Sequence, residues 1–351
     1  MMIEDTKQVT QTDVAKKAGV SRSVVSYVIN NGPRVVSAQT RKRVLKAIKE
    51  LNYRPNKYAQ RLIKEKWDSV ADKQLGIVMS NGVLFERPYY GAILAGIQEA
   101  AHALHHHIRF IRVFESFKDP VLLNQLVHKH EISGLILLAL DQVLETESDY
   151  DLLEHILERI PNIVCVDWEY KNNFSINFDR HAAAYQATKH LLKLGHKAIT
   201  YIGPLDLRLE GFRAAMYEHC LCPTNSSNVS TAVLGYEQAQ QCKLKKVSAV
   251  VAGTDEVAFG ILKYCKDKAL QVPDDLAVVS IDNIALSDFA QPPLTTVAVP
   301  QKEIGKQAID ILIANKENPK LPNKPMMLPI ELVIRESCGS RKALQKHLQI
   351  D

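Results

Sequence analysis

The stretch VTQTDVAKKAGVS occupies residues 9–21, and VVSYVIN follows at residues 24–30. The Thr-x-x-Asp pattern that starts at Thr10 is typical of a helix N-terminus, and Gly19 is typical of a helix end. Ser21 is expected to cap a second helix. Two short helices that meet at Gly-Val-Ser have the spacing of a helix-turn-helix. The apolar positions of the two helices are Val14, Ala15 and Ala18, and then Val24, Val25, Val28 and Ile29.

Two more helical patterns follow before the composition changes. Ser37 is expected to cap a third helix, and Arg54 with Pro55 then breaks the chain. Residues 56–63 read as one short helix, and residues 64–74 are a polar stretch that we interpret as a linker. One face of the third helix contains Val44, Leu45, Ile48 and Leu51.

The second helix has the side chains to read bases in a major groove. Arg22 can pair with a guanine, and Ser23 or Tyr27 can donate or accept a hydrogen bond. Neighbouring hydroxyl and amide side chains are expected to hold phosphates, which set register without reading sequence. That phosphate set is Thr10, Ser21, Asn30 and Tyr53. Thr12 and Ser26 complete the DNA contacts expected from these three helices.

The net charge of +5 is distributed unevenly along the chain. Residues 1–66 contain 15 Lys and Arg against 5 Asp and Glu, which gives a net charge of +10. The other residues hold 29 of the 44 basic and 34 of the 39 acidic residues, a net charge of −5. A basic end on an acidic body indicates nucleic acid at that end alone. The alternative, a helical bundle with an incidental basic face, is disfavoured by this local charge.

Leu62 is an apolar residue on a short helix with Lys57 before it and Lys64 after it. An apolar side chain between basic flanks is typical of a wedge that enters a minor groove. The alternative is that Leu62 packs on a protein core.

From Leu75 onward, short apolar runs alternate with helical patterns, which predicts parallel sheets with right-handed crossovers. About 260 residues of this pattern suit two doubly wound lobes better than one. The expected strands are Leu75–Met79, Ile108–Val113, Gly134–Leu140, Ile163–Asp167, Ala198–Ile202, Ala249–Ala252 and Ala277–Ile281. The expected helices include Gly91–Ala103, Arg180–Leu194, Arg208–His219, Asp255–Lys268 and Gln301–Ala314.

These motifs, taken in order, resemble the LacI/GalR family of bacterial transcription repressors over roughly residues 9–338. The resemblance begins with residues 9–30 and continues through the body of the chain. Its other motifs are Ser37–Arg41, Leu51–Asn56, Ala59–Leu62, His190–Leu191, Leu194–Lys197, Tyr201–Pro204, Arg208–Phe212, Ala252–Gly260, Val279–Asn283 and Pro292–Thr296.

The resemblance implies a homodimer whose two helix-turn-helix heads bind the halves of a palindromic operator in double-stranded DNA. It also implies a body of the periplasmic-binding-protein type, with a small-molecule effector between its lobes. The paired hinge helices would insert Leu62 and its symmetry mate into the central minor groove. The hinge contacts that it implies are Asn56, Ala59, Gln60 and Leu62.

For the effector, a sugar or sugar derivative, family positions fall on Arg208 and Asp282. A guanidinium and a carboxylate can together bracket a polyol, and both residues follow strand ends. The alternative for each is a surface salt bridge. Tyr89, Tyr90 and Trp168 are candidate stacking surfaces for a sugar, although core packing is nearly as good an account of each aromatic residue.

Three departures from the family pattern concern details of recognition. Tyr27 stands where the family most often has Arg, which puts the usual base contact in doubt. Thr254 replaces the common Asn beside Asp255, so its part in effector specificity is open. The linker between Leu62 and Gly76 is several residues longer than usual.

Other kinds of site find little support in the sequence. Four histidines at positions 102 and 105–107 lack a second ligand cluster, and the cysteines lack metal-site or disulfide-framework spacing. We expect no metal, cofactor or catalytic centre, and an N-terminus without signal-peptide character favours the cytoplasm.

The expected organisation is a small all-α head at residues 1–55, a hinge helix and linker at 56–74, an α/β body at 75–338 and a tail at 339–351. Within the body, the first lobe would comprise about 75–171 with 299–327. The second would comprise about 172–298 with 328–338.

The function expected is an effector-controlled repressor of carbohydrate-related genes. Control by a corepressor, a nucleobase or a partner protein, and activation in place of repression, are alternatives. An alternative of another class is a sugar-binding protein or an enzyme that retains a vestigial head.

Overall fold

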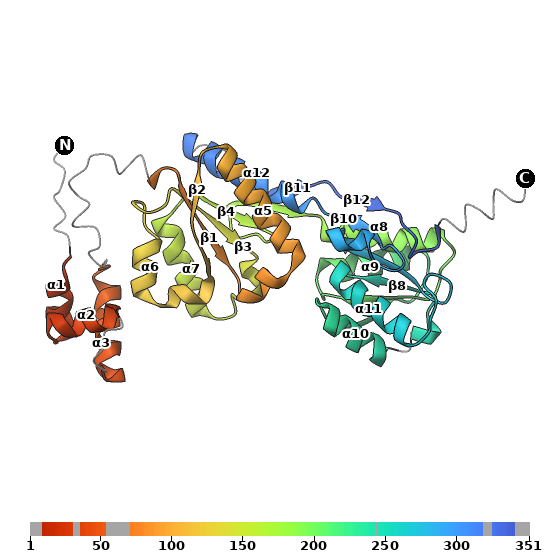
Figure 1. Cartoon of the computed structure of the whole chain (residues 1–351), viewed down its shortest axis with the longest axis horizontal. Coiled ribbons are helices and arrows are strands. Elements are labelled where there is room, and N and C mark those ends of the chain that lie inside the picture. Colours follow the sequence, from red (N-terminus) through yellow and green to blue (C-terminus); the bar gives the residue numbers. More distant parts are fainter. Residues whose placement is uncertain (1–8, 31–35, 54–70, 243, 319–324, 341–351) are drawn as a thin grey trace, which may run out of the picture. The chain divides into compact units, whose positions relative to one another are not determined.

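The computed structural model describes residues 9–30, 36–53, 71–242, 244–318 and 325–340 (Figure 1). The side chains of Asn30, residues 225–227 and Lys245 are not described. The expected hinge helix and most of the linker and tail lie outside these ranges. The predictions for Asn56, Ala59, Gln60 and Leu62 therefore remain predictions.

The head consists of α1 (Gln11–Ala18), α2 (Arg22–Asn30) and α3 (Ala38–Glu50). Thr10 caps α1 through a reciprocal pair of hydrogen bonds. Its Oγ1 accepts from the amide of Asp13 at 3.3 Å, and the Asp13 carboxylate accepts from the amide of Thr10 at 2.8 Å. Gly19 ends α1 with φ of 64°, a conformation that costs glycine little. Ser37 caps α3 by accepting from the amide of Thr40 at 3.2 Å.

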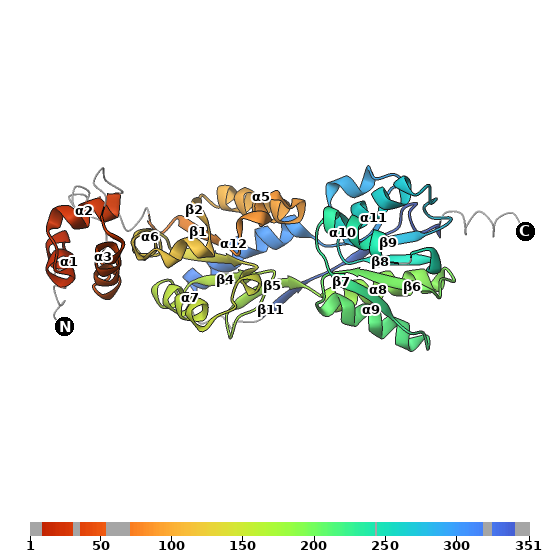
Figure 2. The same ribbon diagram turned by 90° about the horizontal axis from the view of Figure 1, so that it is seen from below.

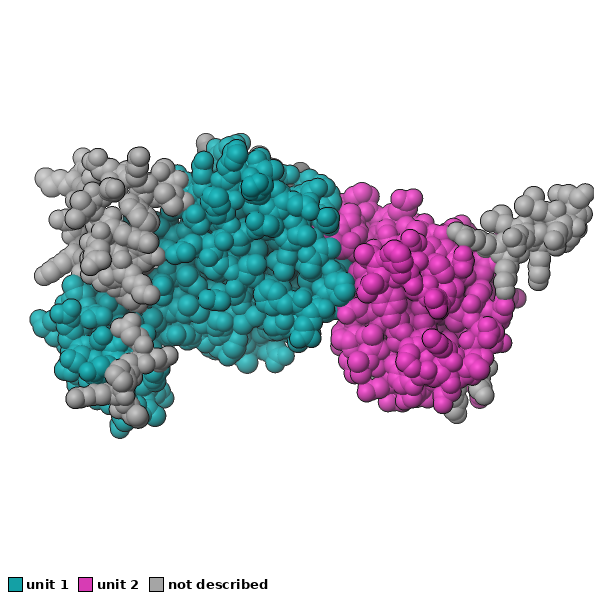
Figure 3. Space-filling view, viewed as in Figure 1, with its two compact units in different colours: residues 1–176, 302–325 teal, residues 177–301, 326–351 magenta. Residues whose placement is uncertain are grey.

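The rest of the chain forms α/β structure in two compact units (Figure 3). Unit 1 is Met1–Ile176 with Lys302–Pro325, and unit 2 is Asn177–Gln301 with Met326–Asp351. Below, lobe 1 means the α/β part of unit 1, and lobe 2 means unit 2; residues 177–178, 301 and 326–328 end elements of lobe 1 and are described with it.

Lobe 1 contains a six-stranded sheet in the order β11-β5-β4-β3-β1-β2. Strands β1 to β5 form parallel pairs along this order. The strands are β1 (Gln74–Met79), β2 (His107–Val113), β3 (Gly134–Leu138), β4 (Ile163–Val166), β5 (Phe174–Phe178) and β11 (Pro325–Leu328). The helices are α5 (Pro88–Ala103), α6 (Pro120–Leu126), α7 (Glu147–Arg159) and α12 (Gln301–Glu317), with 3-10 turns η1 (Gly82–Glu86), η2 (Phe114–Lys118) and η3 (Leu140–Gln142).

Lobe 2 repeats this plan with the order β12-β10-β9-β8-β6-β7, in which β12 alone runs antiparallel to its neighbour. Its strands are β6 (Ile199–Gly203), β7 (Thr224–Asn228), β8 (Ala249–Ala252), β9 (Ala277–Asp282), β10 (Thr295–Ala298) and β12 (Glu331–Val333). Its helices are α8 (Arg180–Lys193), α9 (Leu207–Glu218), α10 (Ala232–Gln241) and α11 (Asp255–Asp267), with 3-10 turns η4 (Leu244–Lys246) and η5 (Ala285–Asp288).

Helices cover both faces of each sheet, as Figure 2 shows most clearly for lobe 2, where α8 with α9 and α10 with α11 lie on opposite sides. In lobe 1, helices α5 and α12 approach each other closely because glycines lie at their contact. A Cβ added at Gly96 of α5 would lie 2.0 Å from the carbonyl oxygen of Lys302, and one at Gly305 of α12 would lie 2.1 Å from that of Ile93. The small all-α head with a doubly wound α/β body confirms the expected fold class.

Two strands end earlier than their apolar runs predict. β3 stops at Leu138 because Ala139 has φ of 52°, and β4 stops at Val166 because Asp167 has φ of 66°. Left-handed backbone cannot continue a strand. Both breaks lie at the carboxyl edge of the lobe 1 sheet, where open α/β sheets bind ligands.

Within the described ranges, the model contains no helix that combines the length and apolar character of a membrane span.

Candidate DNA surface and effector site

The base-reading side chains expected on α2 lie at the surface of the head. Arg22 and Ser23 are exposed in the first turn, and Tyr27 is half-buried one turn later. Ser21 caps the helix weakly, since its Oγ accepts from the Val24 amide at 3.4 Å. The Arg22 Nε donates to Gln11 Oε1 at 3.3 Å, which connects α1 with the start of α2. Both helices can therefore present one surface to DNA.

Among the other expected DNA contacts, Thr10 and Thr12 are exposed and Ser26 is half-buried. Tyr53 was expected in the same set, but only 1% of it is exposed. Its ring follows α3 and packs in the head core with Val14, Val25 and Ile48. This burial favours a packing role for Tyr53 over a phosphate contact. The side chain of Asn30 is not described.

In lobe 2, Arg208 lies in the first turn of α9 and pairs with Asp206, the N-cap of that helix. Arg208 Nε lies 3.1 Å and 3.2 Å from the two carboxylate oxygens, and Nη2 lies 2.7 Å from Oδ2. Arg208 Nη1 donates to the carbonyl oxygen of Gly253 at 3.1 Å. The Arg208 guanidinium is therefore held on two sides, by Asp206 and by the carbonyl oxygen of Gly253.

This pair carries opposite charges in a partly enclosed place. The exposed fraction of the side chain is 12% for Arg208 and 34% for Asp206. Burial raises the pKa of Asp206, but the charge and hydrogen bonds of Arg208, together with the charge of Arg180, outweigh burial, so the net pKa is below its usual value. Burial conversely lowers the pKa of Arg208, but the charge and hydrogen bonds of Asp206, together with the charge of Asp282, raise it above its usual value. Both groups are thus ionised at neutral pH.

Asp282 ends β9 in an unusual backbone conformation, with φ of 123°, and Asn283 follows with φ of 56°. The backbone carbonyl of Asp282 accepts from Gln301 Nε2 at 2.5 Å, and Arg335 Nη2 donates to Asn283 Oδ1 at 2.9 Å. Positive φ at two consecutive non-glycine residues costs energy and persists where surrounding contacts fix it. The turn that carries Asp282 is therefore held by contacts on both sides.

Asp255, at the start of α11, is fully buried and supplies part of that support. Its Oδ2 accepts from the amide of Ile284 at 2.8 Å and from Ser287 Oγ at 2.5 Å. Its Oδ1 accepts from Ser280 Oγ at 2.5 Å and Thr296 Oγ1 at 2.7 Å. One carboxylate therefore connects β9, the turn after it, η5 and β10. Burial raises the pKa of Asp255, and these hydrogen bonds oppose the increase.

Thr254, the other expected effector residue of lobe 2, is the N-cap of α11. Its Oγ1 accepts from the Val257 amide at 3.2 Å, and only 2% of the residue is exposed. In this position its hydroxyl serves the helix, so the structure provides a capping role without indicating an effector contact.

In lobe 1, Tyr89 and Tyr90 both direct their hydroxyls to Asp167. The Tyr89 hydroxyl donates to Oδ1 at 3.2 Å, and the Tyr90 hydroxyl donates to Oδ2 at 2.9 Å. Gln142 Nε2 donates to the Tyr90 oxygen at 3.1 Å. Burial, and next the charge of Asp167, raise the pKa of Tyr90 well above its usual value. For these tyrosines, stacking on a sugar and core packing were both open; both side chains are buried, and their hydroxyls form a polar cluster with Asp167.

Trp168 belongs to the core of lobe 1. Its indole N–H donates to the backbone carbonyl of Leu137 at 2.8 Å, and its ring packs among Leu137, Leu153 and Cys165. Of its two interpretations, core packing is the one that this burial favours, because a ring so enclosed does not present a face to a ligand.

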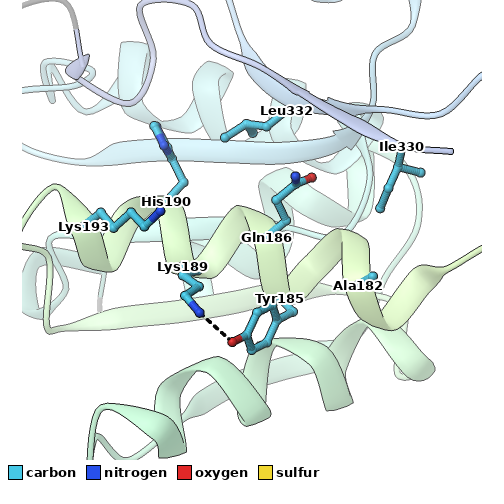
Figure 4. Close-up of a pocket in the computed structure, with 8 residues that line it drawn as sticks. All are labelled: Ala182, Tyr185, Gln186, Lys189, His190, Lys193, Ile330 and Leu332. Carbon is cyan, nitrogen blue, oxygen red and sulfur yellow. Dashed lines mark hydrogen bonds between the residues drawn. The ribbon is translucent and has the colours of Figure 1, made fainter.

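Lobe 2 also has an open surface groove of about 450 Å³ along α8 (Figure 4). Lys189 Nζ donates to the Tyr185 hydroxyl at 2.8 Å, and that hydroxyl donates to Glu218 at 2.7 Å. This lysine already has partners within the protein. The groove is lined by Ala182, Tyr185, Gln186, Lys189, His190, Lys193, Ile330 and Leu332.

The chain matches two protein-family models in the order that its architecture suggests. Residues 10–56 match the model of bacterial regulatory proteins of the lacI family, and residues 188–338 match a periplasmic-binding-protein-like domain. A PurR repressor from Haemophilus influenzae is 32% identical, with 94% of this chain and 99% of that protein covered. The chain belongs to the LacI family. The NTD biosynthesis operon regulator NtdR of Bacillus subtilis strain 168 is 30% identical, with 93% and 99% covered.

Solved structures of regulators agree with this assignment. The lac repressor dimer bound to operator and the anti-inducer ONPF is 27% identical, with a TM-score of 0.66 over 95% of this chain and 99% of that one. The transcriptional regulator CelR in complex with cellobiose is 26% identical, with a TM-score of 0.64 over 94% and 100%. As a LacI-family member, this protein is a DNA-binding transcription regulator with an effector-type α/β body.

Three acidic residues, one in lobe 1 and two in lobe 2, were not singled out as site residues from the sequence. Asp167 could have been found because it follows a buried strand at the ligand-binding edge of a sheet. Asp206 lies two residues before Arg208, which is a spacing that allows a cap and an ion pair at once. The partners of Asp255 come from positions 25 to 41 residues away, and no local pattern indicates them.

Proposed function

We propose that this LacI-family regulator is a repressor of carbohydrate-related genes that binds a palindromic operator as a homodimer and responds to a sugar-like effector. It acts in the cytoplasm, and its α/β body binds the effector without catalysing a reaction. The observation that carries the effector proposal is the arrangement of Arg208 with Asp206 and the Asp282 turn at the carboxyl edge of the lobe 2 sheet.

The geometry of the head supports operator reading. Arg22 and Ser23 stand exposed at the N-terminal end of α2, which is the end that meets base edges when such a helix enters a major groove. An arginine there can contact two acceptors of one guanine. The lac repressor dimer, a structural relative, is bound to operator.

The chemistry of the body supports a polyhydroxylated effector. In lobe 2, Arg208 supplies donors and the carboxylate of Asp282 supplies acceptors. Each hydroxyl of a sugar can both donate and accept a hydrogen bond, so donors and acceptors side by side suit it. A related regulator, CelR, was solved with cellobiose.

Selection from a random DNA pool, followed by footprinting, tests operator binding by the full-length protein. We expect enrichment of a two-fold symmetric site protected on both halves. A pool that yields no palindrome would contradict the proposal.

Effector control is tested by operator binding in the presence of a sugar panel, with Arg208→Ala alongside the wild type. Arg208→Ala should bind the operator normally and lose the response to the active sugar, since its guanidinium is far along the chain from the head. An unchanged response would refute the effector role of Arg208.

A further inference from the structure

We propose that Asp206 makes the Arg208 site of lobe 2 selective for neutral polyhydroxy ligands over anionic ones, such as sugar phosphates and sugar acids. This inference rests on the proposed function, because it concerns the residue proposed to contact the effector. It assigns Asp206 the role of a specificity-determining residue.

The first reason is how the N–H groups of Arg208 are used. A guanidinium has five N–H groups in a fixed plane. Asp206 takes Nε and one N–H of Nη2, and the carbonyl of Gly253 takes one N–H of Nη1. Two N–H groups remain, one on each terminal nitrogen, so a ligand cannot use the Nε–Nη2 edge that Asp206 occupies. Carboxylate and phosphate groups bind best to a free guanidinium edge, and Asp206 already fills one of the two such edges of Arg208.

The second reason is charge. An anion that approaches Arg208 also approaches a carboxylate 2.7 Å from the same guanidinium. The other charges that act on this pair are Arg180, which lowers the pKa of Asp206, and Asp282, which raises the pKa of Arg208. Two positive and two negative groups therefore balance. An anion gains little from such a site and loses its hydration, while a neutral hydroxyl loses less.

The charge of Asp206 can be removed without disturbing the start of α9. Asp206 Oδ1 also accepts from the backbone amide of Arg208 at 2.9 Å, as the helix N-cap. Asn is as good an N-cap as Asp. Asp206→Asn therefore removes the charge and keeps the cap, and it releases the Arg208 edge from its ionic partner.

The test measures binding of inorganic sulfate to the full-length protein by calorimetry and by the shift of the thermal midpoint, at constant ionic strength set with chloride. Wild type should show no sulfate site that depends on Arg208. Asp206→Asn should bind sulfate roughly tenfold or more tightly than wild type, because one charge at this distance is removed. The double variant Asp206→Asn with Arg208→Gln should lose that gain.

Asp179→Asn is the matched control. Asp179 is the N-cap of α8, where it accepts from the Ala182 amide at 2.8 Å, so the variant makes the same charge change at another helix start of the same lobe. It should not create sulfate binding. Lys193→Gln controls for the cations of the α8 groove. Should Asp206→Asn not fold, Asp206→Ser keeps an N-cap oxygen without charge.

Wild-type sulfate binding that Arg208→Gln abolishes would overturn the inference, as would an Asp206→Asn protein with wild-type sulfate affinity.

A second measurement compares matched ligands, glucose with glucose 6-phosphate and ribose with ribose 5-phosphate. A phosphorylated sugar that binds wild type more tightly than its neutral parent through Arg208 would refute this inference while leaving the effector role of Arg208 intact. Loss of the effector role alone would not create or remove the sulfate difference, so the two failures are distinguishable.

Discussion

Replacing Asp255 with Ala should destabilise lobe 2 by about 3 kcal/mol, because the carboxylate accepts four hydrogen bonds inside the core. Among the described residues, the amide of Ile284 donates to Asp255 alone, and a buried unsatisfied amide costs about 1–3 kcal/mol. The hydroxyls of Ser280, Ser287 and Thr296 can rotate toward backbone carbonyls, so each loses less. Removing the charge also removes the cost of burying it, which reduces the sum.

The assay is differential scanning calorimetry of the full-length protein, read at the transition of lobe 2. Lobe 2 is Asn177–Gln301 with Met326–Asp351, a size at which each kcal/mol shifts the thermal midpoint by roughly 2–4 °C. A loss of about 3 kcal/mol therefore lowers that midpoint by roughly 6–12 °C. The same variant should respond poorly to effector, because the Asp282 turn loses the contact at Ile284.

Asp255→Asn is the control for charge against hydrogen bonding. Its carbonyl oxygen can accept from Ile284 and Ser287, and its amide can donate to the oxygens of Ser280 and Thr296. We expect it to retain more than half of the stability that the Ala variant loses, together with the effector response. An Ala variant within roughly 2 °C of wild type would refute the reasoning. An Asn variant as unstable as the Ala variant would show that charge, and not hydrogen bonding, holds the turn.

Arg22→Ala should weaken specific operator binding by about 1–3 kcal/mol and relax the preference at one base pair, and fluorescence anisotropy with operator and scrambled DNA checks this; equal losses on both DNAs would exclude base reading. Tyr90→Phe removes the hydroxyl that bridges Asp167 and Gln142 inside lobe 1, so the free energy of unfolding measured by chemical denaturation should fall by about 1–3 kcal/mol, while the exposed Tyr150→Phe control should be neutral. The pKa of Asp206 is lowered on folding, so its ion pair stabilises above the unfolded value of about 3.9 and is lost as pH falls through the lower folded value. Between pH 5 and 2 the thermal midpoint of wild type should therefore fall more than that of Asp206→Asn, and parallel curves would count against the pairing.

Local signals made the head predictable from the sequence. The Thr10 cap, the glycine that ends α1 and the Ser37 cap each act within four residues, so a single sequence contains them. The same is true of β8, which is a short apolar run and was placed at Ala249–Ala252, where the structure has it.

Strands without an apolar run were missed. β5 has the sequence FSINF, in which Ser175 and Asn177 are buried inside the sheet. β7, with the sequence TNSSN, lies at the sheet edge, where polar residues are tolerated. These segments become strands because neighbouring strands offer hydrogen bonds, and that information is not local.

Burial also decided which aromatic predictions the structure favours. Tyr53 was expected to contact phosphate, and Tyr89, Tyr90 and Trp168 were expected either to stack on a sugar or to pack in a core; all four are buried. A sequence shows where an aromatic ring lies along an element and does not show how much of it the rest of the fold covers. Arg208 and Asp282 were easier to place, since polar residues at strand ends reach the ligand edge of a sheet whatever packs behind them.

Asp206 and Asp255 illustrate how burial gives one residue type two roles. Both are acidic residues at the start of a helix that follows a strand of lobe 2, where an aspartate is locally favoured. Asp206 remains partly exposed beside a guanidinium, and its pKa is lowered. Asp255 is fully enclosed with hydroxyls and an amide as partners, and its pKa is raised. The first can therefore set the charge that a ligand meets, whereas the second can only fix the backbone that carries Asp282. For that reason a substitution at Asp206 should change which ligand binds, and a substitution at Asp255 should change how well any ligand binds.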